Sequence, residues 1–190
     1  MLFRSGGEWI ETRLLSTGPR TNPWFRECSM RPIEKGDLVS FDTDLIGPYG
    51  YCADISRAWV CGARPTDEQR RLYATAYEQI QHNKSILKAG KGFIEVSEQA
   101  WPIPEEFRSN RYSSLIHGVG LADEYPSLKH WEDYPTSGYD GVLEAGMTLC
   151  VESFIGVEGG REGVKLEEQV LITEDGIEQL SGYPLEEDWL

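Results

Sequence analysis

Runs of apolar, β-branched and aromatic residues mark two pairs of β-strands, one early and one late in the chain. The first pair consists of LVSFDTDLI (38–46) and YCADISRAWVC (51–61), joined by the turn sequence GPYG. The second pair consists of MTLCVESFIGV (147–157) and VKLEEQVLIT (164–173), joined by EGGREG. Such runs, separated by glycine-containing turns, are typical of β-hairpins. The pattern therefore predicts two hairpins.

Between the hairpins the apolar positions change to a helical period. Thr66 is followed by two acidic residues and is expected to cap a helix that ends at Ala89–Gly90, with its apolar face formed by Leu72, Ala76, Ile80 and Leu87. A second helix is expected to begin at Ile94 and to stop before Pro102. Residues 117–134 contain many Gly, Asp and Pro residues and predict a loop.

Composition favours a single globular unit and restricts its partners. The 190 residues are 39% hydrophobic and 26% charged, and no repeat, low-complexity tract or linker divides them, so we expect one α+β domain over residues 1–190. The formal charge of −14 argues against nucleic acid and anionic membranes as partners. With no stretch long enough to span a bilayer and no apolar secretory signal in the opening residues, a cytoplasmic location is expected.

Acidic residues inside apolar strands are the most informative anomaly. Asp42 and Asp44 share one face of their strand, Asp54 lies nearly opposite them, and Glu152 and Glu167 lie on the second hairpin. A single strand aspartate is more often an edge residue, but five carboxylates brought together repel one another unless a cation lies between them. With the imidazole of His117, they form an O/N ligand set suited to iron(II), manganese or zinc-like ions, and bridging carboxylates would hold two such ions.

Four segments carrying these residues resemble the creatinase, prolidase and methionine aminopeptidase superfamily. They are GDLVSFDTDLIGPYGYCADISRAW, HGVGL, EAGMTLCVESF and KLEEQVLITEDG, in that order. The resemblance implies the pita-bread fold, a curved antiparallel sheet covered by helices, and metal ligands at a first-strand aspartate, Asp54, His117, Glu152 and Glu167. Full-length relatives carry an N-terminal domain and opening helices, so we expect this chain to be the C-terminal catalytic part, without them.

The chain departs from the peptidases of this superfamily at three places. Thr43 stands where the first ligand aspartate is usual, with Asp42 and Asp44 on either side of it. In HGVGLADEYP, Glu124 lies near the position of a supporting histidine, and TNPWF offers Trp24 and Phe25 where peptidases tend to show another histidine. These departures weaken a peptidase interpretation.

The combination of DTD, RYSSLIHGVGLAD and GMTLCVE resembles the dimethylsulfoniopropionate lyases of the DddP type. That resemblance implies that Asp123 is the catalytic base and that Tyr112 helps to hold a small zwitterionic sulfonium substrate in a homodimeric enzyme. It also implies iron, as two ions with manganese, zinc or cobalt as alternatives, bound by Asp42, Asp44, Asp54, His117, Glu152 and Glu167.

The implied chemistry is a β-elimination that releases dimethyl sulfide and leaves acrylate. A metal on the substrate carboxylate would stabilise the charge that develops as the neighbouring carbon loses its proton. Aromatic faces attract an onium charge, with Tyr112 the first candidate and Trp24, Phe25, Tyr125 and Trp131 weaker ones. Arg57 is expected to be a structural partner of a ligand carboxylate. Two alternatives stay open: a prolidase-like Xaa-Pro metallopeptidase, and a truncated metal-binding domain with little activity.

Overall fold

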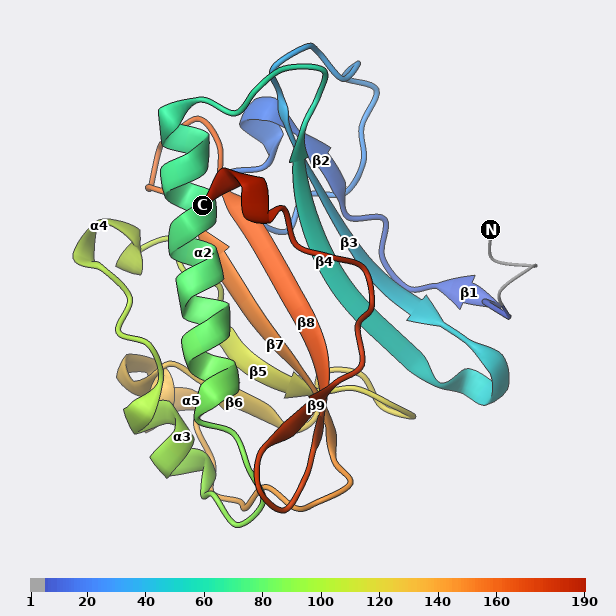
Figure 1. The fold of residues 1–190 in the computed structure, drawn as a ribbon, viewed down its shortest axis with the longest axis vertical. Helices are drawn as coiled ribbons and strands as arrows, with labels where there is room; N and C mark the ends of the chain where they lie inside the picture. The colour runs from blue at the N-terminus through green and yellow to red at the C-terminus, as the bar shows by residue number, and fades with distance from the viewer. Residues whose placement is uncertain (1–5) are drawn as a thin grey trace.

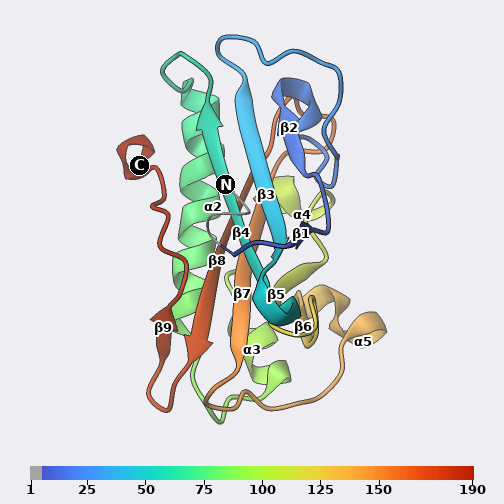
Figure 2. The same ribbon diagram turned by 90° about the vertical axis from the view of Figure 1, so that its right-hand side faces the viewer.

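Two antiparallel sheets form the frame of the computed structural model, which describes residues 6–190 (Figure 1). The first sheet is built around β3, which pairs with its three other strands: β1 (Trp9–Ile10), β2 (Leu15–Thr17), β3 (Leu38–Ile46) and β4 (Cys52–Val60). The second has the order β6-β5-β7-β8-β9, with β5 (Ser114–Gly118), β6 (Ser127–Lys129), β7 (Thr148–Ile155), β8 (Val164–Ile172) and β9 (Ile177–Gln179). Strand β4 lies against β8, so the two sheets meet along their central hairpins (Figure 2).

Both predicted hairpins are present, and their registers align acidic residues. In the β3–β4 hairpin Asp44 pairs with Asp54, and Asp42 pairs with Ser56. In the β7–β8 hairpin Glu152 pairs with Glu167. Since paired residues on an antiparallel ladder present their side chains to the same face, each hairpin gathers its carboxylates on one side.

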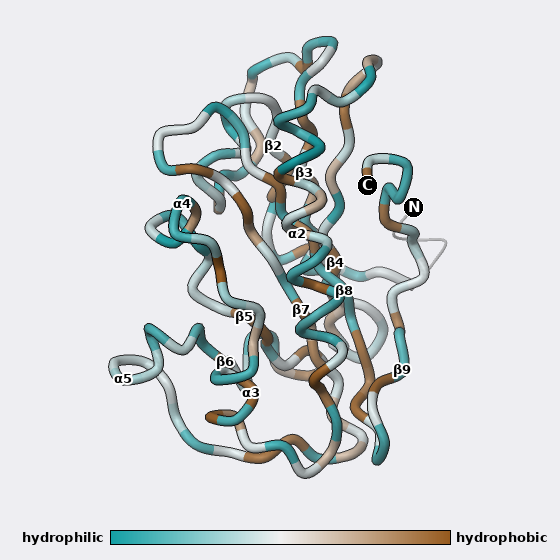
Figure 3. The backbone as a smooth tube through the Cα atoms, turned by 60° about the vertical axis from the view of Figure 1, so that its left-hand side comes forward, coloured by the Kyte–Doolittle hydropathy of each residue, from teal (hydrophilic) through white to brown (hydrophobic). Residues whose placement is uncertain are grey.

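The long helix α2 (Asp67–Ser85) covers β7 and β8. Thr66 and Gln69 form a capping box, in which each side chain bonds to the backbone N–H of the other residue. Apolar and polar residues alternate along the helix (Figure 3), and its apolar face enters the core. The predicted end at Ala89–Gly90 is wrong. The helix ends at Ser85 because the N–H groups of Ala89 and Gly90 donate instead to the carbonyls of Thr173 and Leu143.

The second predicted helix is confirmed as α3 (Phe93–Gln99), and two short helices, α4 (Glu105–Arg108) and α5 (Tyr134–Ser137), were not expected. Short 3₁₀ turns occupy Gly18–Arg20, Pro48–Gly50, Trp131–Asp133 and Glu187–Trp189.

The loop predicted over residues 117–134 is wrong in part, because it contains the end of β5 and all of β6. The reason is a close backbone approach at Gly118, whose N–H donates to the carbonyl of Pro126. A Cβ at Gly118 would lie 1.9 Å from the Tyr125 carbonyl oxygen, so only glycine permits this return of the chain. The return leaves residues 119–126 as a loop at the end of β5.

Among residues 6–190, no helix is long and apolar enough to cross a membrane. The first five residues, part of the segment considered for a secretory signal, lie outside the described residues. All four cysteines are free.

Candidate active site

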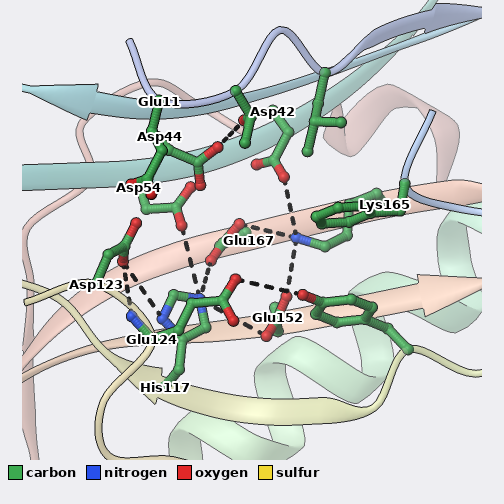
Figure 4. Close-up of a pocket in the computed structure, with 14 residues that line it drawn as sticks. Glu11, Asp42, Asp44, Asp54, His117, Asp123, Glu124, Glu152, Lys165 and Glu167 are labelled. Atoms are coloured by element: carbon green, nitrogen blue, oxygen red, sulfur yellow. Dashed lines mark hydrogen bonds and ion pairs between the residues drawn. The ribbon is translucent and has the colours of Figure 1, made fainter. Parts of the chain in front are cut away.

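The six predicted ligands lie together, although they come from five strands (Figure 4). They line one pocket with a volume of about 300 Å³, and every one is buried: Asp42 and Asp44 on β3, Asp54 on β4, His117 on β5, Glu152 on β7 and Glu167 on β8. The alternation of side chains along each strand aims them at this space.

One half of the cluster is centred on His117. Its Nε2 atom lies 3.1 Å from Glu167 Oε1 and 3.7 Å from both Asp54 Oδ2 and Glu152 Oε1. Ligands about 2.1 Å from one shared ion are separated by roughly 3.0–3.4 Å, so these atoms are close to a coordination shell. Asp54 Oδ1 and Glu152 Oε1 are buried without any hydrogen-bond partner. Orphaned buried carboxylate oxygens are costly, and a cation would satisfy them.

The other half consists of Asp42, Asp44 and Asp54, each with a carboxylate oxygen within 4.8 Å of the others. Hydrogen bonds hold two of them in place: Ser56 donates to Asp42, and Thr12 donates to Asp44. The two halves share Asp54, so the donor set fits two neighbouring divalent ions.

The carboxylates perturb one another's protonation. Burial raises the pKa of Asp42 to about 8 and that of Asp44 to about 6. Burial, followed by the nearby charge of Glu167, also raises the pKa of Asp54. For His117, burial acts to lower the pKa, but Glu152 and Glu167 raise it to about 10. A cluster this crowded with negative charge is unfavourable without added cations.

Lys165 is a buried cation in this cluster that the sequence analysis missed. Its Nζ atom donates to Glu167 Oε2 (2.9 Å) and to Ser56 Oγ (3.0 Å), and lies 3.1 Å from Glu152 Oε2. Burial acts to lower the pKa of Lys165, but the surrounding carboxylates raise it well above its ordinary value. The sequence could have predicted this position, because Lys165 lies two residues before Glu167 in a strand and therefore on the same face.

Asp123 and Tyr112 both line the pocket. Asp123 lies on the loop after β5, half-buried, with Oδ1 3.9 Å from Nδ1 of His117, and burial raises the pKa of its carboxyl group. The Tyr112 hydroxyl lies 3.5 Å from Glu124 Oε1, and its ring stacks on Phe25 with the centroids 6.4 Å apart. A carboxylate and aromatic faces therefore border the cluster of predicted ligands.

Comparison with known proteins identifies the family. The profile of metallopeptidase family M24 matches residues 2–174, which is most of the chain. The chain belongs to metallopeptidase family M24. It is 49% identical over 185 residues to "Dimethylsulfoniopropionate lyase DddP" of Roseovarius nubinhibens, a match that covers 97% of this chain and 42% of that protein. The protein of the same name from Roseobacter denitrificans is 47% identical, with 96% and 41% covered. The chain thus spans about two fifths of the length of these curated relatives.

Solved M24-like structures confirm the pita-bread fold. An X-Pro aminopeptidase from Thermotoga maritima aligns with a TM-score of 0.79 at 27% identity, covering 96% of this chain and 50% of that one. Prolidase from Pyrococcus furiosus aligns with a TM-score of 0.78 at 29% identity, covering 94% and 51%. The sheets and covering helix described above are therefore an M24 architecture.

Within this M24 fold, several weaker sequence predictions need correction. Tyr125 and Trp131 are absent from the pocket lining described here; they stack on Tyr139 and Tyr134. Trp24 instead packs over Lys165, with its ring centroid 5.2 Å from Nζ.

Arg57 does not pair with a predicted ligand carboxylate. Its guanidinium pairs with Glu168, which points away from the pocket, and it reaches the neighbouring ligand Glu167 only at the backbone carbonyl. The error follows from strand alternation, which places Glu168 and Arg57 on the face opposite to Glu167.

Proposed function

We propose that residues 1–190 form a single metal-binding catalytic domain of a lyase that cleaves dimethylsulfoniopropionate to dimethyl sulfide and acrylate. The observation that carries this proposal is the position of Asp123, a half-buried carboxylate next to His117 at the edge of the ligand cluster. Similarity to two dimethylsulfoniopropionate lyases over nearly the whole chain supports the choice of substrate.

The six clustered residues would hold the metal. His117, Glu152 and Glu167 would bind one ion and Asp42 and Asp44 the other, with Asp54 between them. Iron is the proposed metal, with manganese, zinc or cobalt as alternatives. When bound, the metal pair would stabilise the negative charge that develops on the substrate carboxylate as the adjacent carbon loses its proton.

The chain's own residues would supply the base and the orientation. Asp123 accepts the proton from the carbon beside the carboxylate, and the carbon–sulfur bond breaks with its electron pair going to sulfur. Dimethyl sulfide leaves as a neutral molecule and needs no acid. The faces of Tyr112 and Phe25 attract the sulfonium before it leaves. The raised pKa of Asp123 makes its carboxylate a stronger base than an exposed one.

A prolidase-like activity is the second candidate, because the Xaa-Pro dipeptidase of Pyrococcus furiosus is 31% identical over 171 residues. His117 is the only histidine among the described residues that line the pocket, which favours the lyase. A metal-binding domain with little activity of its own is the third. Homodimer formation and a cytoplasmic location stay predictions of the sequence.

The decisive experiment is headspace gas chromatography over iron-loaded protein supplied with dimethylsulfoniopropionate, alongside an Xaa-Pro dipeptide assay. We expect dimethyl sulfide release that a chelator abolishes. Dipeptide cleavage without sulfide release would assign the peptidase activity instead. Metal binding without either product would favour the weakly active domain.

A further inference from the structure

Carboxylates line the pocket at both ends, and only the inner end also holds a lysine among the described residues. Lys165, the one Lys or Arg among the described lining residues, is buried at the inner end. Glu11 and Glu124 lie exposed at the mouth, beside half-buried Asp123. Figure 4 shows Glu124 next to Asp123 and the His117 ring.

The inner end suits the carboxylate of a zwitterionic substrate. Lys165 already lies there among the ligand carboxylates, and the unpartnered buried oxygens of Glu152 and Asp54 call for further cations at the same end. A substrate whose carboxylate binds the metal-loaded inner end beside Lys165 has its cationic group at the other end of the molecule. The cationic group must therefore lie toward the mouth.

Glu124 is placed to meet such a group. Its carboxylate lies 3.5 Å from the Tyr112 hydroxyl, on the ring that stacks with Phe25, so an anion borders a pair of aromatic faces. An onium group is attracted by both features. Glu124 also has a φ of 59°, a left-handed conformation that is costly for a residue with a side chain. Such strain is often retained where a side chain must be held in a functional position.

We propose that Glu124 is a specificity-determining residue that selects substrates carrying an onium group at the end remote from the carboxylate. This inference rests on the proposed function, since it assumes that the carboxylate occupies the metal end. It assigns to Glu124 a role separate from that of its neighbour Asp123: Glu124 attracts the cation, whereas Asp123 removes the proton.

The test uses two carboxylates with the same skeleton that cannot release dimethyl sulfide. One is 3-(dimethylamino)propanoate, which is an ammonium at neutral pH, and the other is 4-methylpentanoate, which is uncharged at that position. Calorimetry on the metal-loaded protein gives the dissociation constant of each. We expect wild-type protein to prefer the cation, and E124Q to reduce that preference by about two- to fivefold, the range of an exposed charge pair.

E158Q is the matched control, because it removes the same charge from an exposed turn outside the pocket and should leave the preference unchanged. Equal melting temperature and metal content of E124Q and wild type would show that E124Q is folded and loaded. An unchanged preference in E124Q, or no preference in wild type, would overturn the role of Glu124. Dimethyl sulfide release by wild type is measured separately, so a failure of the proposed reaction is distinguishable from a failure of onium selection.

Discussion

Replacing Arg57 should strongly lower the free energy of unfolding. Arg57 on β4 is 3% exposed, and its Nη2 lies 3.1 Å from Oε1 of buried Glu168 on β8. It also donates to the backbone carbonyls of Ser56 (2.9 Å) and Glu167 (2.6 Å), and to those of the C-terminal segment at Tyr183 and Pro184. One side chain thus connects both sheets and the C-terminal segment.

In Arg57→Met the chain keeps an apolar stem of similar length but leaves the Glu168 carboxylate buried without its cation. Breaking a buried ion pair in this way costs about 3–5 kcal/mol. The carbonyls that lose their donors add to the cost where water cannot reach them. The double variant R57M/E168Q removes the stranded charge, and we expect it to recover about half of the loss, with the rest reflecting the lost carbonyl contacts.

The measurement is urea unfolding of metal-free wild type, R57M, E168Q and the double variant, followed by circular dichroism. A loss below about 1 kcal/mol in R57M would refute the reasoning, since an exposed pair costs that little. So would a double variant as unstable as R57M, because the unpaired charge of Glu168 would then not be the cause.

Three further predictions concern the pocket. Asp123→Asn should keep the metal content and lower dimethyl sulfide release by about 10²–10⁴-fold, the usual contribution of a general base; full activity would exclude Asp123 as the base. His117→Ala and Glu152→Ala should each lower the metal content per chain measured by elemental analysis, and unchanged content would refute their assignment as ligands. Burial raises the pKa of Asp42 from 3.8 to about 8, because the buried site favours the protonated carboxyl group. The free energy of unfolding of the metal-free chain therefore falls as pH rises through that range and this carboxyl group ionises. Metal needs the deprotonated ligand, so the metal-induced increase in Tm should grow between about pH 5 and pH 8, and a constant increase would contradict this.

Local sequence signals predicted the strands and the placement of carboxylates well, because both depend on short-range periodicity. The period of two places Asp42 and Asp44 on one face, and the turn after Ile46 determines that Asp54 lies opposite Asp44. The end of α2 was not predictable in the same way. Leu87 continues the apolar period and is buried, but the chain leaves the helix to reach carbonyls more than 50 residues away in sequence.

The role of His117 illustrates another limit. Its glycine-rich surroundings predicted a loop, yet it lies in β5, where pairing with Cys150 on β7 aims its ring at the cluster. Strand β5 is short and depends on pairing with residues far along the chain, which no local pattern reveals. The resemblance to the creatinase, prolidase and methionine aminopeptidase superfamily implied His117 as a ligand even though the local structure was misassigned.

Lys165 changes the charge balance of the ligand cluster. The five ligand carboxylates carry five negative charges, and two divalent ions would neutralise only four of them. The buried ammonium of Lys165, 2.9 Å from Glu167 Oε2, supplies the fifth positive charge, so the ligand cluster with Lys165 would reach neutrality with two ions and a neutral His117. With one ion it would keep two negative charges in a buried space, which is costly. A strand lysine two positions before a ligand glutamate therefore argues for two metal ions, more directly than the number of carboxylates does.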